Sequence, residues 1–147
     1  MNSYIEMKNR HQEEVNSFPM HFAFGDEQIK RKIAELNLDP LRLSEQIVSI
    51  GCGGFVLKED APALKEMWKR HAEERRAAIA ADTTGDGYIY DMFLYELQNH
   101  EYGYTFSTED TIEALGYSEE VIESTPALKN GLEKAAKKIR EREGCEW

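Results

Sequence analysis

Apolar residues recur at helical spacing along most of this 147-residue chain, and this periodicity constrains the fold more than any other feature. Apolar side chains that are three and four positions apart lie on one face of a helix. The pattern predicts helices over residues 2–17, 26–36, 60–81, 88–100, 107–116 and 127–142, with a short helical turn at 118–120. Pro126 supports the last of them, because proline fits the first turn of a helix. We therefore expect about six helices.

A glycine-rich turn separates two short β-prone segments. Ile47–Ile50 and Phe55–Leu57 flank the sequence Gly51-Cys52-Gly53-Gly54, which is typical of a hairpin turn or a bulge. The aromatic segment 18–24 predicts a further, buried strand. The expected fold class is α+β and mostly α, with the helices packed around one β-hairpin or a two- to three-stranded sheet. Because two separate cores would each be marginal at this length, we expect a single domain over residues 1–147.

The N-terminal residues and the cysteines favour a cytoplasmic protein. Residues 1–6 have neither the basic stretch nor the apolar stretch of a secretory signal. No window approaches the roughly 20 apolar residues that cross a bilayer. Cys52 and Cys145 are the two cysteines and give no disulfide framework, which suits a reducing compartment. For Cys52 we expect a structural turn with a small buried thiol.

The negative charge is concentrated in one segment of the chain. The formal net charge is -10, yet residues 1–76 contain 12 basic and 13 acidic residues, and residues 129–147 contain 6 and 4. Residues 77–128, called the acidic block from here on, contain 11 acidic residues and no Lys or Arg. A net charge of -10 argues against a general nucleic-acid binder, which needs an excess of Lys and Arg to neutralise phosphates, and we expect no direct binding of nucleic acid. Its sign also disfavours an anionic membrane surface as a partner.

Six of the seven tyrosines also lie in the acidic block. Carboxylates without counter-charges repel one another, and a basic partner would relieve that repulsion. Because Tyr is common at protein interfaces, we expect the block to bind a basic protein surface. The residues predicted to contact this partner are Asp82, Asp86, Tyr88, Tyr90, Asp91, Tyr95, Glu101, Tyr102, Tyr104, Glu109 and Asp110. Alternatively, the block is a solvated face that contacts the Lys- and Arg-rich last helix of the same chain.

The turn that begins at Asp82 has part of the pattern of a calcium loop. Oxygen-bearing residues stand at the first, third and fifth positions, and Gly87 stands at the sixth. The twelfth position, which should hold a bidentate glutamate, holds Phe93. We therefore interpret this segment as an ordinary polar turn.

Three histidines lie on the apolar faces of predicted helices, each near a glutamate. Facing helices that project His and Glu inward form metal sites in helical bundles. The metal-ligand candidates are His11, Glu14, His71, Glu74, Glu96 and His100. The usual order in such bundles is Glu-x-x-His, however, whereas His11 and His71 precede their glutamates. Hydrogen-bonded core histidines are therefore the favoured interpretation, and we expect no cofactor.

Four further segments, Phe18–Phe24, Gly51–Phe55, His100–Thr105 and Pro126–Leu132, have no known chemistry but form a characteristic set. In these segments the chain resembles a family of small uncharacterised proteins encoded by phages and prophages of Gram-positive bacteria. The resemblance implies an accessory protein that acts in the cytoplasm of a bacterial host and binds a host factor. It carries over no catalytic or binding residue.

Three functions are consistent with these features. The favoured one is a non-enzymatic phage accessory protein, an anti-defence factor or host-factor inhibitor, whose acidic block binds a basic surface such as that of a host nucleic-acid-binding protein. The second is a metal-binding protein or a metal-dependent hydrolase that uses helix-borne His and Glu. The third is a structural homodimer that pairs aromatic residues near Trp68 and Phe93 across a twofold axis.

Overall fold

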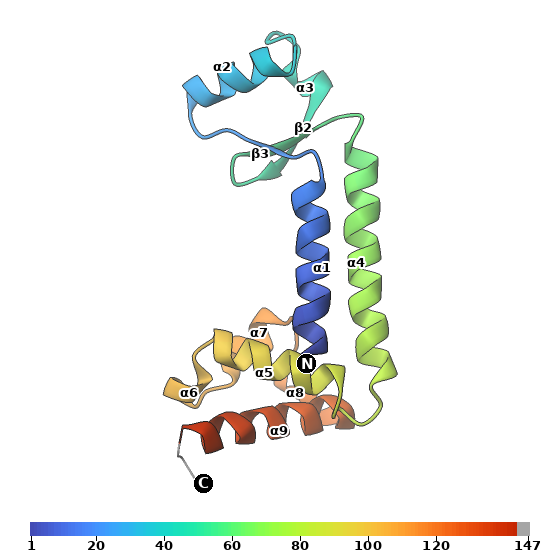
Figure 1. The fold of residues 1–147 in the computed structure, drawn as a ribbon, viewed down its shortest axis with the longest axis vertical. Helices are drawn as coiled ribbons and strands as arrows, with labels where there is room; N and C mark the ends of the chain where they lie inside the picture. Colours follow the sequence, from blue (N-terminus) through green and yellow to red (C-terminus); the bar gives the residue numbers. More distant parts are fainter. Residues whose placement is uncertain (144–147) are drawn as a thin grey trace. The chain divides into compact units, whose positions relative to one another are not determined.

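The computed structural model describes residues 1–143 and divides the chain into two compact units (Figure 1). The sheet unit comprises Gln12–Ala72, and the helical unit comprises Met1–His11 with Glu73–Trp147. Nine helices and one three-stranded sheet occur within the described residues, which confirms the α+β, mainly α fold class. The expectation of a single domain over 1–147 stays a prediction, and Cys145 lies outside the described residues.

The elements follow one another as the sequence pattern predicts, with two short helices in addition. Helices α1 (Ser3–Ser17) and α4 (Ala61–Ala81) each contribute residues to both units. The sheet unit contains β1 (His21–Phe22), α2 (Asp26–Glu35), α3 (Leu43–Gln46), β2 (Ile47–Gly51) and β3 (Gly54–Leu57). The helical unit contains α5 (Tyr88–Asn99), α6 (Tyr102–Thr105), α7 (Glu109–Ala114), α8 (Glu119–Ser124) and α9 (Pro126–Arg142). The sequence pattern did not predict α3 and α6.

The sheet is antiparallel, in the order β1-β3-β2, and the hairpin predicted around the glycine-rich turn joins β2 to β3. Its ladder is irregular between Ser49 and Gly51, and Gly51 and Gly53 have positive φ angles of 87° and 76°. Only glycine adopts such angles without steric cost, so these two residues allow the turn. The sequence predicted a hairpin turn or a bulge here, and the structure confirms the hairpin, with an irregular ladder beside the turn.

The segment 18–24 was predicted as a buried strand; a short strand, β1, is confirmed within it, but the predicted burial is wrong. Strand β1 has only two residues, and Phe22 and Phe24 are 50% and 64% exposed. Their rings lie against the backbones of Gly54 and Gly53, where an added Cβ would come within 2.8 Å of each ring. The rings thus cover the outside of the hairpin turn and do not enter the core.

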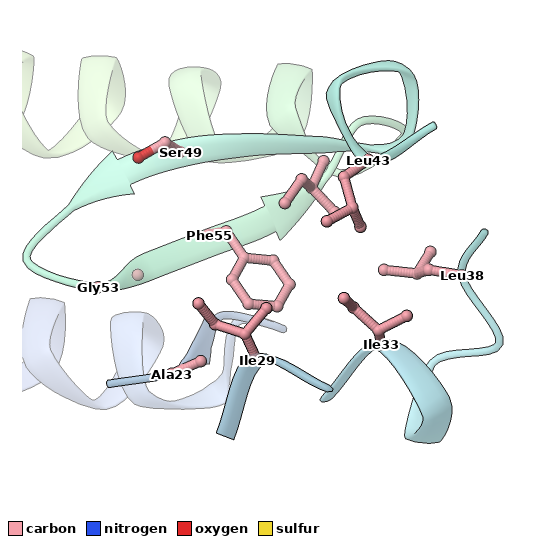
Figure 2. A pocket seen from close by; sticks show the side chains of 10 residues that line it. Ala23, Ile29, Ile33, Leu38, Leu43, Ser49, Gly53 and Phe55 are labelled. Atoms are coloured by element: carbon pink, nitrogen blue, oxygen red, sulfur yellow. The ribbon is translucent and has the colours of Figure 1, made fainter. Parts of the chain in front are cut away.

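The core of the sheet unit is small. Val56, Leu64 and Met67 form its buried apolar cluster, with Val15 and Phe18 among the half-buried residues around them, and Ala23 is buried outside this cluster. Helix α2 contributes no buried residue, although its apolar side chains face the hairpin (Figure 2).

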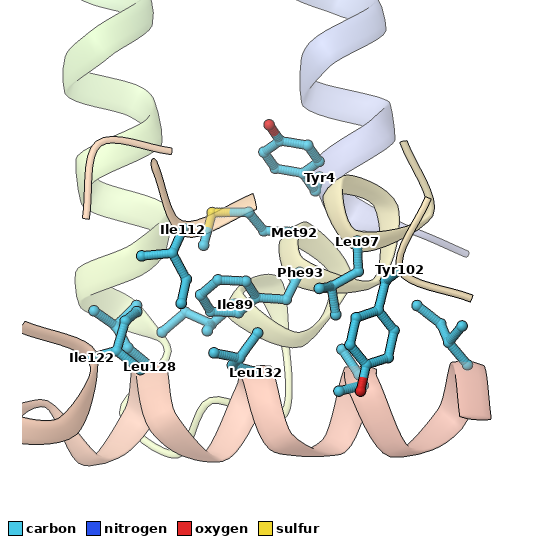
Figure 3. Packing of buried hydrophobic residues seen from close by; sticks show 13 residues of the cluster. Tyr4, Ile89, Met92, Phe93, Leu97, Tyr102, Ile112, Ile122, Leu128 and Leu132 are labelled. Atoms are coloured by element: carbon cyan, nitrogen blue, oxygen red, sulfur yellow. The ribbon is translucent and has the colours of Figure 1, made fainter. Parts of the chain in front are cut away.

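The helical unit is built around α5 and α9 (Figure 3). Phe93 is fully buried, and Ile89 and Leu97 of the same helix face Leu132 and neighbouring residues of α9. The two helices approach closely because Gly131 has no side chain, and a Cβ there would lie 2.6 Å from Cγ2 of Ile89. The ring of Phe93 is therefore enclosed in the core of its own chain and cannot pair across a twofold axis, whereas Trp68 is 45% exposed. The homodimer stays a prediction.

The first turn of α1 is anchored on α5 within the helical unit. Asn2 Oδ1 accepts a hydrogen bond from the backbone N–H of Ile5 at 2.9 Å, as an N-cap does. The Tyr4 hydroxyl donates to Glu96 Oε1 at 2.8 Å inside the core. Burial, together with this bond to a carboxylate, raises the pKa of Tyr4 above its ordinary value.

Among the described residues, no helix is both long enough and apolar enough to cross a lipid bilayer.

Candidate functional site

The acidic and tyrosine residues that were predicted to bind a partner all lie in the helical unit, but they have three different environments. Asp82, Asp86 and Asp91 hold groups of the same unit through hydrogen bonds or an ion pair. Tyr88, Tyr90, Tyr95 and Tyr102 are buried or half-buried. Glu101, Tyr104, Glu109 and Asp110 are exposed.

Asp82 caps the start of α5. One of its carboxylate oxygens accepts a hydrogen bond from the N–H of Gly85 at 2.9 Å. The other accepts from the N–H groups of Gly87 and Ile89, both at 3.0 Å. These backbone donors would otherwise lack helical partners, so the carboxylate stabilises the turn and the helix that follows it.

Two further carboxylates of the acidic block contact the basic last helix. Asp86 pairs with Lys134 and accepts a hydrogen bond from Asn130 at 2.9 Å. The bonds from Lys134 and then Asn130 lower the pKa of Asp86. Glu123 pairs with Lys129 at 2.9 Å. The alternative interpretation of the sequence was that the acidic block contacts the last helix of the same chain. The pairs Asp86–Lys134 and Glu123–Lys129 are contacts of this kind.

Asp91 holds the N-terminal segment in place. Its Oδ2 accepts hydrogen bonds from the backbone N–H and the hydroxyl of Ser3, at 2.8 and 2.7 Å. This carboxylate therefore serves the fold, and it is unsuited to a charge-reversal test of partner binding.

The covered tyrosines stabilise the helical unit from within. The hydroxyl of Tyr102 accepts a hydrogen bond from Arg140 at 2.7 Å. The ring centroids of Tyr88 and Tyr95 each lie 5.7 Å from that of Tyr4. Burial raises the pKa of Tyr88. Most of the area of these rings is thus occupied by contacts inside the unit.

The exposed remainder lies at the residue before α6, on α6 and α7, and in the segment between these two helices. We call it the α6–α7 surface and define it as Glu101, Tyr104, Phe106, Glu109 and Asp110. Tyr104 is 87% exposed and Phe106 is 40% exposed, whereas most aromatic residues of this unit are covered. Phe106 was not among the residues predicted to contact a partner, because that prediction counted only tyrosines among the aromatic residues. A phenylalanine within the polar segment 105–110 was the signal available.

The backbone on both sides of α6 adopts a left-handed conformation. Glu101 and Phe106 have φ angles of 58° and 55°, although neither is glycine. Such a conformation costs roughly 1–2 kcal/mol for an ordinary residue. Residues held at this cost are common at binding sites, where they fix the orientation of neighbouring side chains. Here they fix a four-residue helix that carries Tyr104.

A fourth carboxyl-bearing side chain borders this surface from the residue that follows α9. The Glu143 side chain lies against Gly103, where an added Cβ would be 3.3 Å from its Cγ. The acidic block itself supplies no Lys or Arg to this region. Arg140 of α9 reaches Tyr102 of α6, so the carboxylates of this surface have a basic neighbour from outside the acidic block.

The histidines predicted as metal ligands lie beside glutamates that also have an Arg or Lys partner. Glu14 accepts bonds from Arg70 and from His71 Nε2, the latter at 2.7 Å, within the sheet unit. The bond from Arg70, followed by that from His71, lowers the pKa of Glu14 to about 2. These partners occupy both carboxylate oxygens, so each bond competes with a metal ion for the same lone pairs.

The second Arg-His segment forms the same kind of cluster inside the helical unit. Arg10 donates to Glu74 at 2.7 Å, and His11 Nε2 lies 3.5 Å from the same carboxylate. The bond from Arg10 lowers the pKa of Glu74 to about 2. The sequence Arg-His-x-Glu-Glu occurs at residues 10–14 and 70–74, and in each case the arginine and histidine pair with the last glutamate of the other copy.

The remaining candidates, Glu96 and His100, lie one helical turn apart on α5. Their side chains are 3.6 Å apart, and Lys8 reaches the same buried carboxylate at 4.0 Å. Within residues 1–143, no three His, Cys, Asp or Glu side chains gather into a group that could hold a metal ion. The six candidates are therefore distributed over three separate ion-pair clusters.

Cys52 was expected to be a buried thiol, and this expectation is wrong. It lies exposed at the tip of the β2–β3 turn, with a left-handed φ of 50°. The positive φ angles of three consecutive residues turn the chain so sharply that its tip projects into solvent.

Comparison of the sequence with known proteins identifies a family for this chain but no biochemical activity. A model described as a family of unknown function (DUF7659) matches residues 3–138. The chain belongs to this family. The matched span of DUF7659 includes the α6–α7 surface and the whole sheet unit. No curated protein and no solved structure matches the chain.

Proposed function

We propose that this protein is a non-enzymatic binding protein whose α6–α7 surface binds a Lys- and Arg-rich surface of a partner protein. The observation that supports this most directly is the exposure of two aromatic side chains, Tyr104 at 87% and Phe106 at 40%, in a block that contains 11 acidic residues and no Lys or Arg. Aromatic residues and charge complementarity are the two features that distinguish protein interfaces from ordinary surface.

The two kinds of side chain have different roles in the proposal. Glu101, Glu109 and Asp110 attract the partner and set the dependence of association on salt. Tyr104 enters a cleft on the partner, and the exposed part of Phe106, whose ring packs edge-on against Tyr102 with centroids 6.1 Å apart, adds to the apolar area that holds the complex together. The partner therefore has an apolar cleft with a rim of Lys and Arg.

The finer form of the proposal concerns the biological setting. The sequence resemblance to phage and prophage proteins suggests a bacterial host factor as the partner. A basic surface that normally binds nucleic acid would suit the α6–α7 surface, because carboxylates can compete with phosphates for the same cations. In this form the protein inhibits the host factor in the cytoplasm of the bacterium.

The test compares two double charge reversals that change the net charge equally. Glu101→Lys/Glu109→Lys alters the α6–α7 surface, and Glu119→Lys/Glu120→Lys alters exposed acids of α8. Proteins retained from bacterial lysate by wild type and by each variant are compared at low and at high salt. We expect the first variant to lose the retained basic protein and the second to keep it.

Equal losses with both variants would show that net charge alone governs retention, and would contradict the proposal. Retention by wild type that persists at high salt would also contradict it, because exposed charges are then screened. A nucleic-acid competitor added to the wild-type sample tests the finer form, since it should release the retained protein.

A further inference from the structure

The sheet unit contains an apolar cavity between α2 and the β2–β3 hairpin (Figure 2). Its volume is about 270 Å³. Ile29 and Ile33 of α2 and Leu38 line one side, and Phe55 and Leu43 line the other. Ser49, which is exposed, carries the one polar side chain among the lining residues that the structure describes.

The cavity is held open by hydrogen bonds at both ends of α2. Before the helix, the N–H of Ala23 donates to the carbonyl of Gly53 at 2.9 Å, and the N–H of Phe24 donates to Gln28 at 2.7 Å. After the helix, the side chain of Gln46 accepts from the N–H of Asp39 at 3.0 Å and donates to its carbonyl at 2.8 Å. The helix is thus tied to the hairpin and to α3 by its ends.

The middle of α2 does not fill the space that these bonds leave. No residue of α2 is buried, and Ile29 remains 39% exposed beside the cavity. Burial of apolar surface stabilises a protein by about 25 cal/mol for each Å². The apolar surface that lines this unfilled cavity does not contribute that free energy. A ligand that covers this area would recover that free energy without any rearrangement of the tied ends.

We infer that this cavity is a binding site for a small, uncharged, apolar molecule of about ten carbon atoms. We estimate the size of the ligand by scaling the cavity volume: a cavity of about 150 Å³ lined by aliphatic side chains holds benzene, which has six carbons. A cavity of about 270 Å³ then holds about ten carbons. The polarity follows from the lining, because no charged side chain faces the cavity among the described residues. A peptide segment is a poor occupant, because its N–H and C=O groups would lack partners there.

Naphthalene is a suitable probe, because it has ten carbons and no polar group. Methyl-resolved NMR spectra of the full chain are recorded during a titration with naphthalene. We expect saturable shifts at the methyl groups of Ile29, Ile33 and Ile47, with no saturable shift at Ile89 or Ile122 in the core of the helical unit. Absence of saturable shifts at the cavity methyls would overturn the inference.

A pair of matched tryptophan variants separates the cavity from nonspecific adsorption. Ile33→Trp fills the cavity, and Arg31→Trp places the same side chain at an exposed position of the same helix. We expect Ile33→Trp to weaken naphthalene binding at least tenfold, and Arg31→Trp to leave the dissociation constant within twofold of wild type. If Ile33→Trp alters the circular dichroism spectrum, Ile29→Trp replaces it in the same comparison. Equal affinity of wild type and a folded filled variant would overturn the inference.

Discussion

The two units differ in how completely they bury their apolar residues. The helical unit encloses Phe93 and Leu97 completely, with contributions from α5, α7, α8 and α9. The sheet unit has a small core, leaves Phe22 and Phe24 exposed, and holds α2 above an unfilled cavity. The difference shows which side chains each unit leaves exposed. The helical unit exposes carboxylates together with Tyr104 and part of Phe106, whereas the sheet unit exposes apolar side chains.

The largest expected effect comes from removing the central ring of the closed core. Phe93→Ala should destabilise the helical unit by about 3–5 kcal/mol, because it creates a cavity among residues that cannot collapse fully. Ile33→Ala in the sheet unit should cost only about 1 kcal/mol, because this side chain already borders open space. Urea unfolding measures both changes. Equal losses of unfolding free energy would show that the units are packed alike.

A smaller effect is expected where α5 and α9 approach each other. Gly131→Ala should destabilise by about 1–3 kcal/mol, since the added methyl group would meet Cγ2 of Ile89 and the carbonyl oxygen of Gly85. Lys137→Ala, an exposed change on the same helix, should stay within about 0.5 kcal/mol of wild type. Thermal unfolding compares the two variants, and a neutral Gly131→Ala would contradict the close helix contact.

The acid dependence of stability should be similar in the two units, because each contains one glutamate whose pKa is about 2. Glu14 and Glu74 have pKa values below the ordinary 4.5 because arginine side chains donate to them. A carboxyl with a lowered pKa in the folded state stabilises the fold above about pH 4.5, and this contribution is lost as the pH falls toward 2.

Urea unfolding between pH 6 and pH 2.5 measures this loss. We expect Glu14→Gln and Glu74→Gln each to reduce the decline in unfolding free energy over that range. Glu13→Gln, on the exposed face of α1, should leave the decline as in wild type. Identical profiles for all three variants would contradict the assignment of the ion pairs.

The sequence was sufficient to predict the elements that have strong local signals. The apolar spacing of α1, α4 and α5, and Pro126 at the start of α9, lie in the chain itself, and the structure confirms these helices. The hairpin at Gly51–Gly54 is confirmed for the same reason. Local signals of this kind do not depend on tertiary contacts with the rest of the chain.

The roles of individual acidic residues depend on contacts between segments that are distant in the chain. These contacts could not be predicted from the sequence. Asp91 meets Ser3 across 88 positions, and Asp86 meets Lys134 across 48. The short helix α6 is bounded by Glu101 and Phe106 in left-handed conformations, for which the usual signal would be glycine or asparagine. The block of charge was therefore visible in the sequence, while the part of it that faces solvent was not.

The most direct test of the account measures how the affinity for the retained partner depends on salt. Dissociation constants are determined for wild type, Glu101→Lys/Glu109→Lys and Glu119→Lys/Glu120→Lys over a series of salt concentrations. The account predicts that the α6–α7 variant binds about tenfold or more weakly at low salt and has a shallower salt dependence, while the α8 variant follows wild type. Parallel curves with equal losses for the two variants would contradict the assignment of the binding site to the α6–α7 surface.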